Sequence, residues 1–282
     1  MPLKLCAFVP SSVIFYRSML TAPKNEKLFW RRKARQYPMP FDPATFRKTS
    51  RIIALAEKLG ADFRGRDLLD IGCGTGIYAL VLAKTVRRAL GVDSSGSMLR
   101  RFRTEAVRRG IKNVRTLKSV WTEVETARVD KKFDIALASM THAVINLRAL
   151  KKMEAAAREL CVYIGWAGVR KNPFLEEIYS HHGIKYEAPK GAEEIVPLLK
   201  RRGRKFKVIY FRDSWQWKGI PGEVLKDIEV SLKVNGAGPD RSWLDKFLKN
   251  RTRNGELTHT TTARKGLIVW RPGRRTSRPT AI

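Results

Sequence analysis

The stretch DLLDIGCGTG, residues 67–76, decides the fold. Its first half is a short apolar run typical of a buried strand, and the following IYALVLAKTV (77–86) is typical of a helix. Between them, Gly72, Gly74 and Gly76 mark a sharp turn, because glycine leaves room for a ligand to lie against the backbone. The stretch therefore predicts a strand, a glycine-rich turn and a helix that together form a ligand site.

The spacing of the glycines separates two classes of cofactor. A dinucleotide fingerprint is G-x-G-x-x-G. Here the third glycine comes one residue earlier, and Asp70 precedes the first glycine by two residues. This D-x-G-x-G-x-G arrangement resembles motif I of class I S-adenosylmethionine-dependent methyltransferases. The resemblance implies that the turn wraps the methionine and ribose part of that cofactor, with Asp70 near its amino group. It assigns the following turn residues to the cofactor site: Gly72, Cys73, Gly74, Thr75 and Gly76.

A second acidic residue supports the resemblance. ALGVD (89–93) reads as the next strand and ends in Asp93, 17 residues after Gly76. A carboxylate at that strand end can accept hydrogen bonds from both ribose hydroxyls of a nucleoside. By the same resemblance, Asp93 is the motif II acid, and Ser94 and Met98 lie near the adenine.

The third element departs from the family pattern. After VRTLKSV (114–120) many relatives carry an acidic residue that binds the adenine amino group, whereas this chain has Ser119, Val120 and Trp121. A valine side chain makes no such hydrogen bond. The expected adenine contacts are therefore the backbone, Ser119, and the indole of Trp121.

The strand FDIALAS (133–139) looks like the methyltransferase strand that ends beside the transferred methyl group. The resemblance places its last residue, Ser139, in the cofactor site. It also places His142 near the methyl acceptor, where a neutral imidazole can take a proton from a hydroxyl or an amine. Family members often cover the cofactor with the segment before the first strand, which makes Tyr37 a further candidate contact. No histidine or cysteine spacing indicates a metal site.

Strands and helices alternate along the chain in a way that predicts parallel strands with right-handed crossovers. The expected fold is α/β, a doubly wound, mostly parallel seven-stranded sheet of the Rossmann-like methyltransferase type with helical cap insertions. FKVIYFRDSWQW (206–217) and ARKGLIVWRP (263–272) are the expected sixth and seventh strands, with the seventh antiparallel.

The expected domain organisation follows from these elements. One methyltransferase domain spans 27–270, with its cofactor half at 67–168. Two insertions, at about 171–204 and 218–262, are expected to form a helical cap over the acceptor pocket. The flanking segments, 1–26 and 271–282, are expected to be a disordered extension and a basic tail.

Charge leaves two partners open. The chain has 282 residues, 57 Lys and Arg against 26 Asp and Glu, and a formal net charge of +31. Such an excess is typical of nucleic-acid-binding proteins, but here it is spread along the chain without a binding tail. There is no run of about 18 apolar residues, so no membrane span is expected. Three scattered cysteines favour a reducing compartment, the cytoplasm.

Three functions fit these observations. The first is a methyltransferase that uses S-adenosylmethionine to methylate a small molecule, favoured by the predicted cap and by the lack of a known RNA-binding module. The second is an RNA methyltransferase, favoured by the charge. The third is a non-catalytic binding protein that keeps the cofactor fold. The sequence leaves the acceptor atom and the oligomeric state open.

Overall fold

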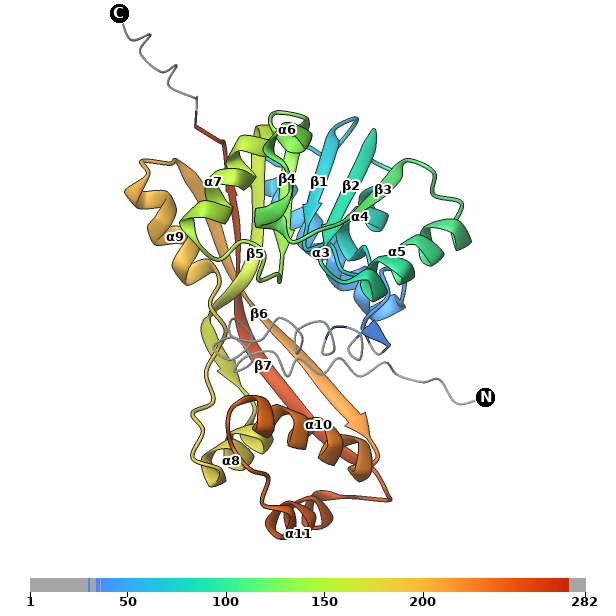
Figure 1. Cartoon of the computed structure of the whole chain (residues 1–282), viewed down its shortest axis with the longest axis vertical. Helices are drawn as coiled ribbons and strands as arrows, with labels where there is room; N and C mark the ends of the chain where they lie inside the picture. Colours follow the sequence, from blue (N-terminus) through green and yellow to red (C-terminus); the bar gives the residue numbers. More distant parts are fainter. Residues whose placement is uncertain (1–29, 31–33, 36, 274–282) are drawn as a thin grey trace, which may run out of the picture.

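The computed structural model describes residues 30, 34–35 and 37–273. They form one seven-stranded sheet in the order β3-β2-β1-β4-β5-β7-β6 (Figure 1). The expected N-terminal extension and most of the basic tail lie outside the described residues. The strands are β1 (Asp67–Ile71), β2 (Arg88–Asp93), β3 (Val114–Lys118), β4 (Phe133–Ser139), β5 (Ala157–Lys171), β6 (Phe206–Gly219) and β7 (Leu257–Trp270).

The pairing directions give the sheet its class. β1 pairs in parallel with β2 and β4, while β7 runs antiparallel to both β5 and β6. Every residue of β1 is buried, as expected for a central parallel strand covered on both faces. The predicted doubly wound, mostly parallel seven-stranded sheet with an antiparallel last strand is confirmed.

Helices cover both faces of the sheet. The helices are α3 (Pro43–Lys58), α4 (Ile77–Leu82), α5 (Gly96–Arg108), α6 (Thr126–Val129), α7 (Leu147–Ala156), α8 (Pro173–His181), α9 (Ala192–Arg201), α10 (Pro221–Val234) and α11 (Arg241–Arg251). One apolar core joins Ile52 of α3 and Phe102 of α5 to the sheet. The other joins Leu150 of α7 and Leu199 of α9 to its opposite face. The layers thus follow the spacing of apolar residues along these helices.

Two strands are longer than the sequence indicates. The apolar pattern places the start of β7 at 263, but the strand begins at Leu257. Its additional residues alternate between buried Leu257, His259 and Thr261 and exposed threonines. β5 likewise begins at Ala157, where the sequence predicts the end of a helix, because Ala157 pairs with Phe133 of β4. In both places strand pairing overrides local propensity.

The long strands β5, β6 and β7 reach past the carboxyl ends of the others and carry a separate group of helices (Figure 1). There, α8, α10 and α11 enclose a third apolar core with Trp217 and Leu257. We call this group the distal layer. The first predicted insertion, 171–204, is divided by the fold. Its α8 joins the distal layer, whereas its α9 packs on the main sheet through Ile195 and Leu199.

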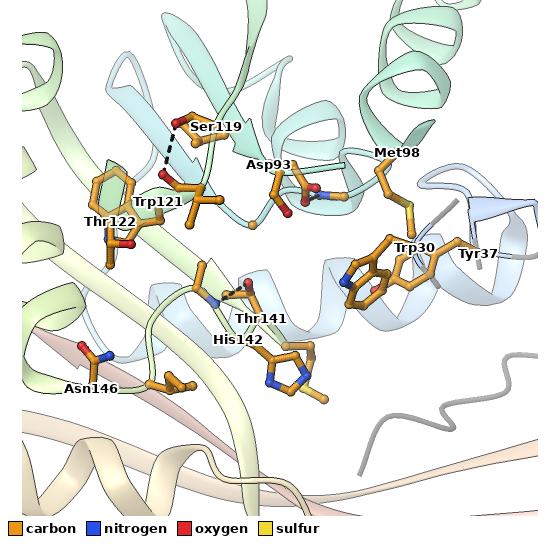
Figure 2. A pocket seen from close by; sticks show the side chains of 18 residues that line it. Trp30, Tyr37, Asp93, Met98, Ser119, Trp121, Thr122, Thr141, His142 and Asn146 are labelled. Carbon is orange, nitrogen blue, oxygen red and sulfur yellow. Dashed lines mark hydrogen bonds between the residues drawn. The ribbon is translucent and has the colours of Figure 1, made fainter. Parts of the chain in front are cut away.

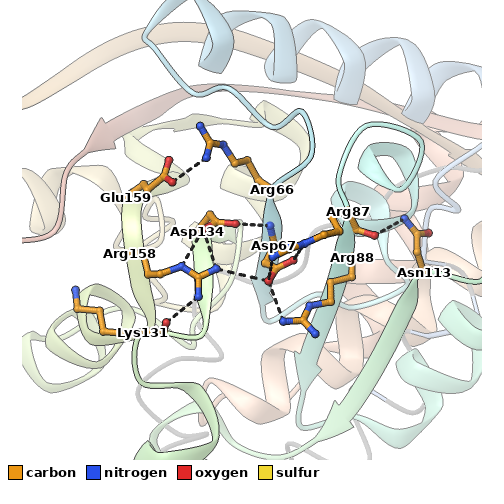
Figure 3. Close-up of polar contacts among 9 residues, drawn as sticks. All are labelled: Arg66, Asp67, Arg87, Arg88, Asn113, Lys131, Asp134, Arg158 and Glu159. Atoms are coloured by element: carbon orange, nitrogen blue, oxygen red, sulfur yellow. Dashed lines mark hydrogen bonds and ion pairs between the residues drawn. The ribbon is translucent and has the colours of Figure 1, made fainter.

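The amino ends of the strands are held by a network of ions around Asp67 (Figure 3). The side chain of Asp67 is fully buried, and its oxygens accept hydrogen bonds from Arg87 at 2.7 and 2.8 Å and from Arg88 at 2.9 Å. Asp134 accepts the backbone N–H of Asp67 at 2.8 Å and is paired with Arg158. These contacts fix β1, β2 and β4 in register at the edge opposite their carboxyl ends.

The hydrogen bonds from Arg87 lower the pKa of Asp67 from 3.8 to about 2. A lowered folded-state pKa means that the stabilisation is present above pH 4 and is lost as the pH falls towards 2. Asp67→Asn should therefore lower the free energy of unfolding at pH 7 by about 1–3 kcal/mol, and the deficit should shrink below pH 4. Urea unfolding at both pH values measures this. The exposed pair Asp62–Arg64 supplies the control, since Asp62→Asn should change nothing measurable. A deficit independent of pH would contradict the electrostatic origin.

Candidate active site

The turn between β1 and α4 uses its three glycines for different reasons. All three have positive φ, +69° at Gly72, +55° at Gly74 and +84° at Gly76. A Cβ on Gly72 would lie 2.0 Å from the Thr141 hydroxyl oxygen, and one on Gly76 would lie 2.4 Å from the ring of Phe102. A Cβ on Gly74 would meet nothing nearer than Tyr37, at 3.7 Å. Packing thus requires Gly72 and Gly76, whereas a Cβ on Gly74 would lie in the cavity and make only an ordinary contact with Tyr37.

Asp93 ties this turn to the end of β2. Its Oδ2 accepts the backbone N–H of Gly74 at 2.9 Å, and its Oδ1 accepts that of Ser95 at 2.8 Å. The carboxylate therefore fixes two loops at the carboxyl edge of the sheet at once. Ligands of open α/β sheets bind at this edge.

A cavity of about 300 Å³ opens at that edge (Figure 2). Its wall combines aromatic and apolar side chains with hydroxyls, one carboxylate and one imidazole. The lining residues are Trp30, Tyr37, Gly72, Gly74, Val92, Asp93, Ser94, Met98, Ser119, Val120, Trp121, Thr122, Met140, Thr141, His142, Ala143, Ile145 and Asn146. Nine of the predicted cofactor-site residues line this cavity, and so does His142, the predicted acceptor-side residue. They come from the ends of β1, β2, β3 and β4 and the loops that follow, from α5, and from the segment before α3.

The segment before α3 closes one side of the cavity. The rings of Trp30 and Tyr37 meet edge to face, with centroids 6.4 Å apart. The Thr75 hydroxyl donates to the carbonyl of Pro38 at 2.8 Å, which anchors this segment to the glycine-rich turn. Burial, with the nearby charge of Asp93, raises the pKa of Tyr37 to about 12. The phenol is therefore neutral at physiological pH and serves as a wall and a hydrogen-bonding group.

Val120, which stands after β3 where many relatives carry an acidic residue, gives the cavity an apolar rim. Val120 lines it and is 44% exposed. Trp121 is buried, and its indole Nε1 donates to the carbonyl of Ala149 at 3.2 Å. The Ser119 hydroxyl donates to the carbonyl of Val120 at 3.1 Å. Trp121 thus both packs the core and presents an edge to the cavity.

The loop after β4 forms the opposite wall. Met140 has a φ of +48°, which is uncommon for a residue with a side chain, and its N–H donates to the carbonyl of Ile164 at 2.7 Å. The Thr141 hydroxyl accepts the N–H of Ala143 at 3.1 Å and so closes a tight turn. Strained backbone of this kind is concentrated at functional sites.

His142 stands on this loop and points into the cavity (Figure 2). Burial lowers the pKa of its imidazole from 6.5 to about 4. The ring is therefore neutral at physiological pH. It is a weak base and a good hydrogen-bond partner.

Five sequence candidates lie outside the lining. Asp70 is buried beneath the turn, accepts the N–H of Ala79 at 3.2 Å, and has a pKa raised to about 7 mainly by burial. Ser139 bonds to the hydroxyl of Tyr78. The other three, Cys73, Thr75 and Gly76, shape the turn from behind. Eight lining residues were not among the candidates: Trp30, Val92, Thr122, Met140, Thr141, Ala143, Ile145 and Asn146. Asn146 carried a local signal, as the helix cap that accepts the N–H of Ala149.

The other histidines have structural partners away from this cavity. His181 contacts Asp240 at 3.0 Å and stacks on Trp243. His259 stacks on Phe174 and bonds to Asn172 in the distal layer.

Comparison with known proteins agrees with this geometry. Residues 68–161 match the family model described as "Methyltransferase domain". These residues form a class I methyltransferase domain. The enzyme transfers methyl groups, and S-adenosylmethionine is the cofactor that its glycine-rich turn and Asp93 indicate.

Solved methyltransferase-like structures share the fold. YcgJ from Bacillus subtilis is 17% identical with a TM-score of 0.51, over 79% of this chain and 98% of that one. A putative methyltransferase from Bacillus halodurans is 12% identical with a TM-score of 0.54, over 80% and 100%. No curated protein sequence matched.

The cavity of this methyltransferase fits its cofactor. Asp93 offers carboxylate oxygens at the edge where a ribose would lie, and the Gly74 backbone leaves a space that a side chain would fill. Trp121 offers aromatic surface, which suits a nucleoside.

Gly74 provides a test of the cofactor site. Gly74→Ala should weaken S-adenosylhomocysteine binding by about tenfold or more, because the new methyl group enters the cavity. Gly110→Ala is the matched control: Gly110 has a similar φ of +64° but open space around it, so it carries the same backbone strain without touching the cavity. Titration calorimetry on both folded variants measures the difference. Equal losses would contradict the assignment.

Proposed function

We propose that this methyltransferase transfers a methyl group to a small molecule bound beside His142. The observation that carries the proposal is the composition of the cavity wall. Among the described residues, no lysine or arginine lines it, and its only carboxylate, Asp93, is held by the turn. A site that admits a flipped or single-stranded base would carry cations for the adjoining phosphates.

Each lining residue then has a proposed role. Gly72, Gly74 and Tyr37 surround the methionine part of the cofactor, and Asp93 accepts the ribose hydroxyls. The adenine lies among the residues that follow β2 and β3. These are Ser94, Met98, Ser119, Val120 and Trp121. Asp70 lies beneath the turn and interacts with the amino group of the cofactor through the turn backbone or through a water molecule.

The chemistry asks little of the protein beyond positioning. When bound, S-adenosylmethionine supplies a methyl group on a sulfonium, and its loss leaves a neutral thioether. The wall of Trp30, Tyr37 and Met140 excludes water, and the strained loop after β4 holds the acceptor in line. His142 Nδ1 or Nε2 accepts a hydrogen bond from the acceptor hydroxyl or amine and aligns its lone pair.

An RNA acceptor is the second candidate, and one feature of the sheet favours it. Arg212 of β6 lies directly opposite Arg264 of β7, and both are exposed. Like charges at opposite positions of an antiparallel pair are destabilising, so a polyanion would relieve them. Neither arginine lines the cavity, so RNA is the second candidate.

No helix among the described residues is long and apolar enough to cross a membrane. A cytoplasmic location, with the acceptor drawn from soluble metabolites, is part of the same proposal.

The deciding assay follows radiolabelled methyl groups from S-adenosylmethionine. Purified protein is incubated separately with a set of small aromatic and aliphatic acids, phenols and amines, and with total RNA. Label in a small molecule and none in RNA is expected. Label in RNA alone, lost steeply with added salt, would overturn the proposal.

His142 gives a second test. His142→Gln should lower kcat/KM by about 100-fold, while S-adenosylhomocysteine affinity stays unchanged. Since the pKa of about 4 keeps the imidazole neutral, any change in rate between pH 6 and 8 should be the same in the wild type and in His142→Gln, because it arises from other groups such as Asp70, whose pKa is about 7. His182→Gln, on a helix end of the distal layer, is the control and should behave as wild type. An equal loss of cofactor affinity in His142→Gln would refute the acceptor-side role.

A further inference from the structure

One arginine fastens a side of the cavity without lining it. Arg101 of α5 donates from Nη1 to the carbonyl of Arg35 at 2.8 Å and from Nη2 to the carbonyl of Tyr37 at 3.4 Å. Its Nε donates to the Sδ of Met39 at 3.3 Å. We call Arg35 and Tyr37–Met39 the wall segment. All three nitrogens of the guanidinium therefore bind this one segment.

The wall segment is also fastened to the glycine-rich turn. The Thr75 hydroxyl donates to the carbonyl of Pro38 at 2.8 Å, so two consecutive carbonyls are bound by different elements. Pro38 has a fixed φ, and a proline also restricts the residue before it to extended conformations. The backbone at Tyr37 is thus held on both sides. Its ring lines the cavity, where a Cβ on Gly74 would lie 3.7 Å from it.

One face of α5 touches three parts of the cofactor cavity. Met98 lines the cavity, Arg101 binds the wall segment, and the ring of Phe102 fills the space behind Gly76. Residues three and four apart lie on the same face of a helix. Arg101 therefore belongs to the construction of the cavity, although it is not among the described residues that line it.

A guanidinium suits this task better than any other cation. Its donors form a rigid, planar fork, whereas a lysine ammonium is a single point on a flexible chain. A lysine at position 101 would keep the charge but could not reach acceptors on three residues at once. The three acceptors of Arg101 are two backbone carbonyls and a thioether. Arg101 thus acts through the geometry of its hydrogen bonds.

We infer that Arg101 is a positioning residue that holds Tyr37 against the bound cofactor and so slows the release of the cofactor. Trp30 meets the Tyr37 ring edge to face and is held with it. The inference rests on the proposed placement of the methionine part of the cofactor beside Tyr37. It is the same for a small-molecule acceptor and for RNA. Differences in affinity between variants of one site lie mostly in the dissociation rate, which is where a held wall acts.

The test compares Arg101→Gln with Arg103→Gln in the full chain. Both remove one positive charge from α5, but Arg103 is exposed and donates instead to Thr116 of β3 at 3.0 Å. S-adenosylhomocysteine is titrated calorimetrically, and its dissociation is followed as loss of radiolabel during a chase with unlabelled compound.

Arg101→Gln should raise the Kd about tenfold, with most of the increase in the dissociation rate. Arg103→Gln should stay within about twofold of the wild type. An unchanged dissociation rate in Arg101→Gln, or equal changes in the two variants, would overturn the inference.

A double-mutant cycle distinguishes positioning from a direct effect of Arg101 on the cofactor. In a Tyr37→Ala background, Arg101→Gln should raise the Kd by about threefold at most, because the ring that it positions is already absent. Equal effects in the two backgrounds would contradict action through Tyr37. Arg101→Lys should recover only part of the wild-type affinity, and full recovery would show that the charge alone matters.

Two results separate this inference from the placement on which it rests. If Tyr37→Ala leaves the Kd unchanged, the cofactor does not lie against Tyr37, and both fail. If Tyr37→Ala weakens binding and Arg101→Gln does not, the inference alone fails. Without ligand, Arg101→Gln and Arg103→Gln should melt within about 3 °C of each other. A clearly lower melting temperature for Arg101→Gln would make its role one of general stability and would also overturn the inference.

Discussion

The carboxylate of Asp93 is the contact on which the site depends. It accepts the N–H of Gly74 and that of Ser95, and so joins the turn after β1 to the loop after β2. The turn also needs glycine at two positions, because Thr141 occupies the space of a side chain at Gly72 and Phe102 that of a side chain at Gly76. The backbone N–H groups of Gly74 and Ser95 thus fix the turn and the loop at one side of the cavity. This arrangement leaves Gly74 open towards a ligand.

A strongly basic chain must distribute few acids among many cations. Several buried carboxylates are each shared by two or more cations: Asp67 by Arg87, Arg88 and Arg158, Glu105 by Arg108 and Arg109, Glu154 by Arg202 and Arg204, and Asp213 by Lys48 and Lys265. Most of these arginines keep contact with water, so the acids are the buried members. Lys265 is the exception, since it is as buried as its acid.

Three strands of this methyltransferase domain are extended and carry additional helices. β5, β7 and β6 continue beyond the cofactor edge and support the distal layer. No residue of α8, α10 or α11 is among those that line the described cavity. Instead, the face of the extended strands comes next to the loop that holds Met140 and His142.

The sequence by itself determined the mostly parallel seven-stranded sheet and the edge of it that binds the cofactor. The signals for both, the spacing of the glycines, Asp93 at a strand end and the alternation of apolar runs, are contained in short stretches of the chain. The sequence also named Tyr37, Val120 and His142, all of which line the cavity. Only the tertiary structure decided which glycine faces the ligand, that α9 leaves the predicted cap for the main sheet, and that Asp70 is buried behind the turn. It alone brought Arg170, Lys265 and Trp215 together. These outcomes depend on strand pairing and a bulge between residues far apart in the chain, which no local pattern encodes.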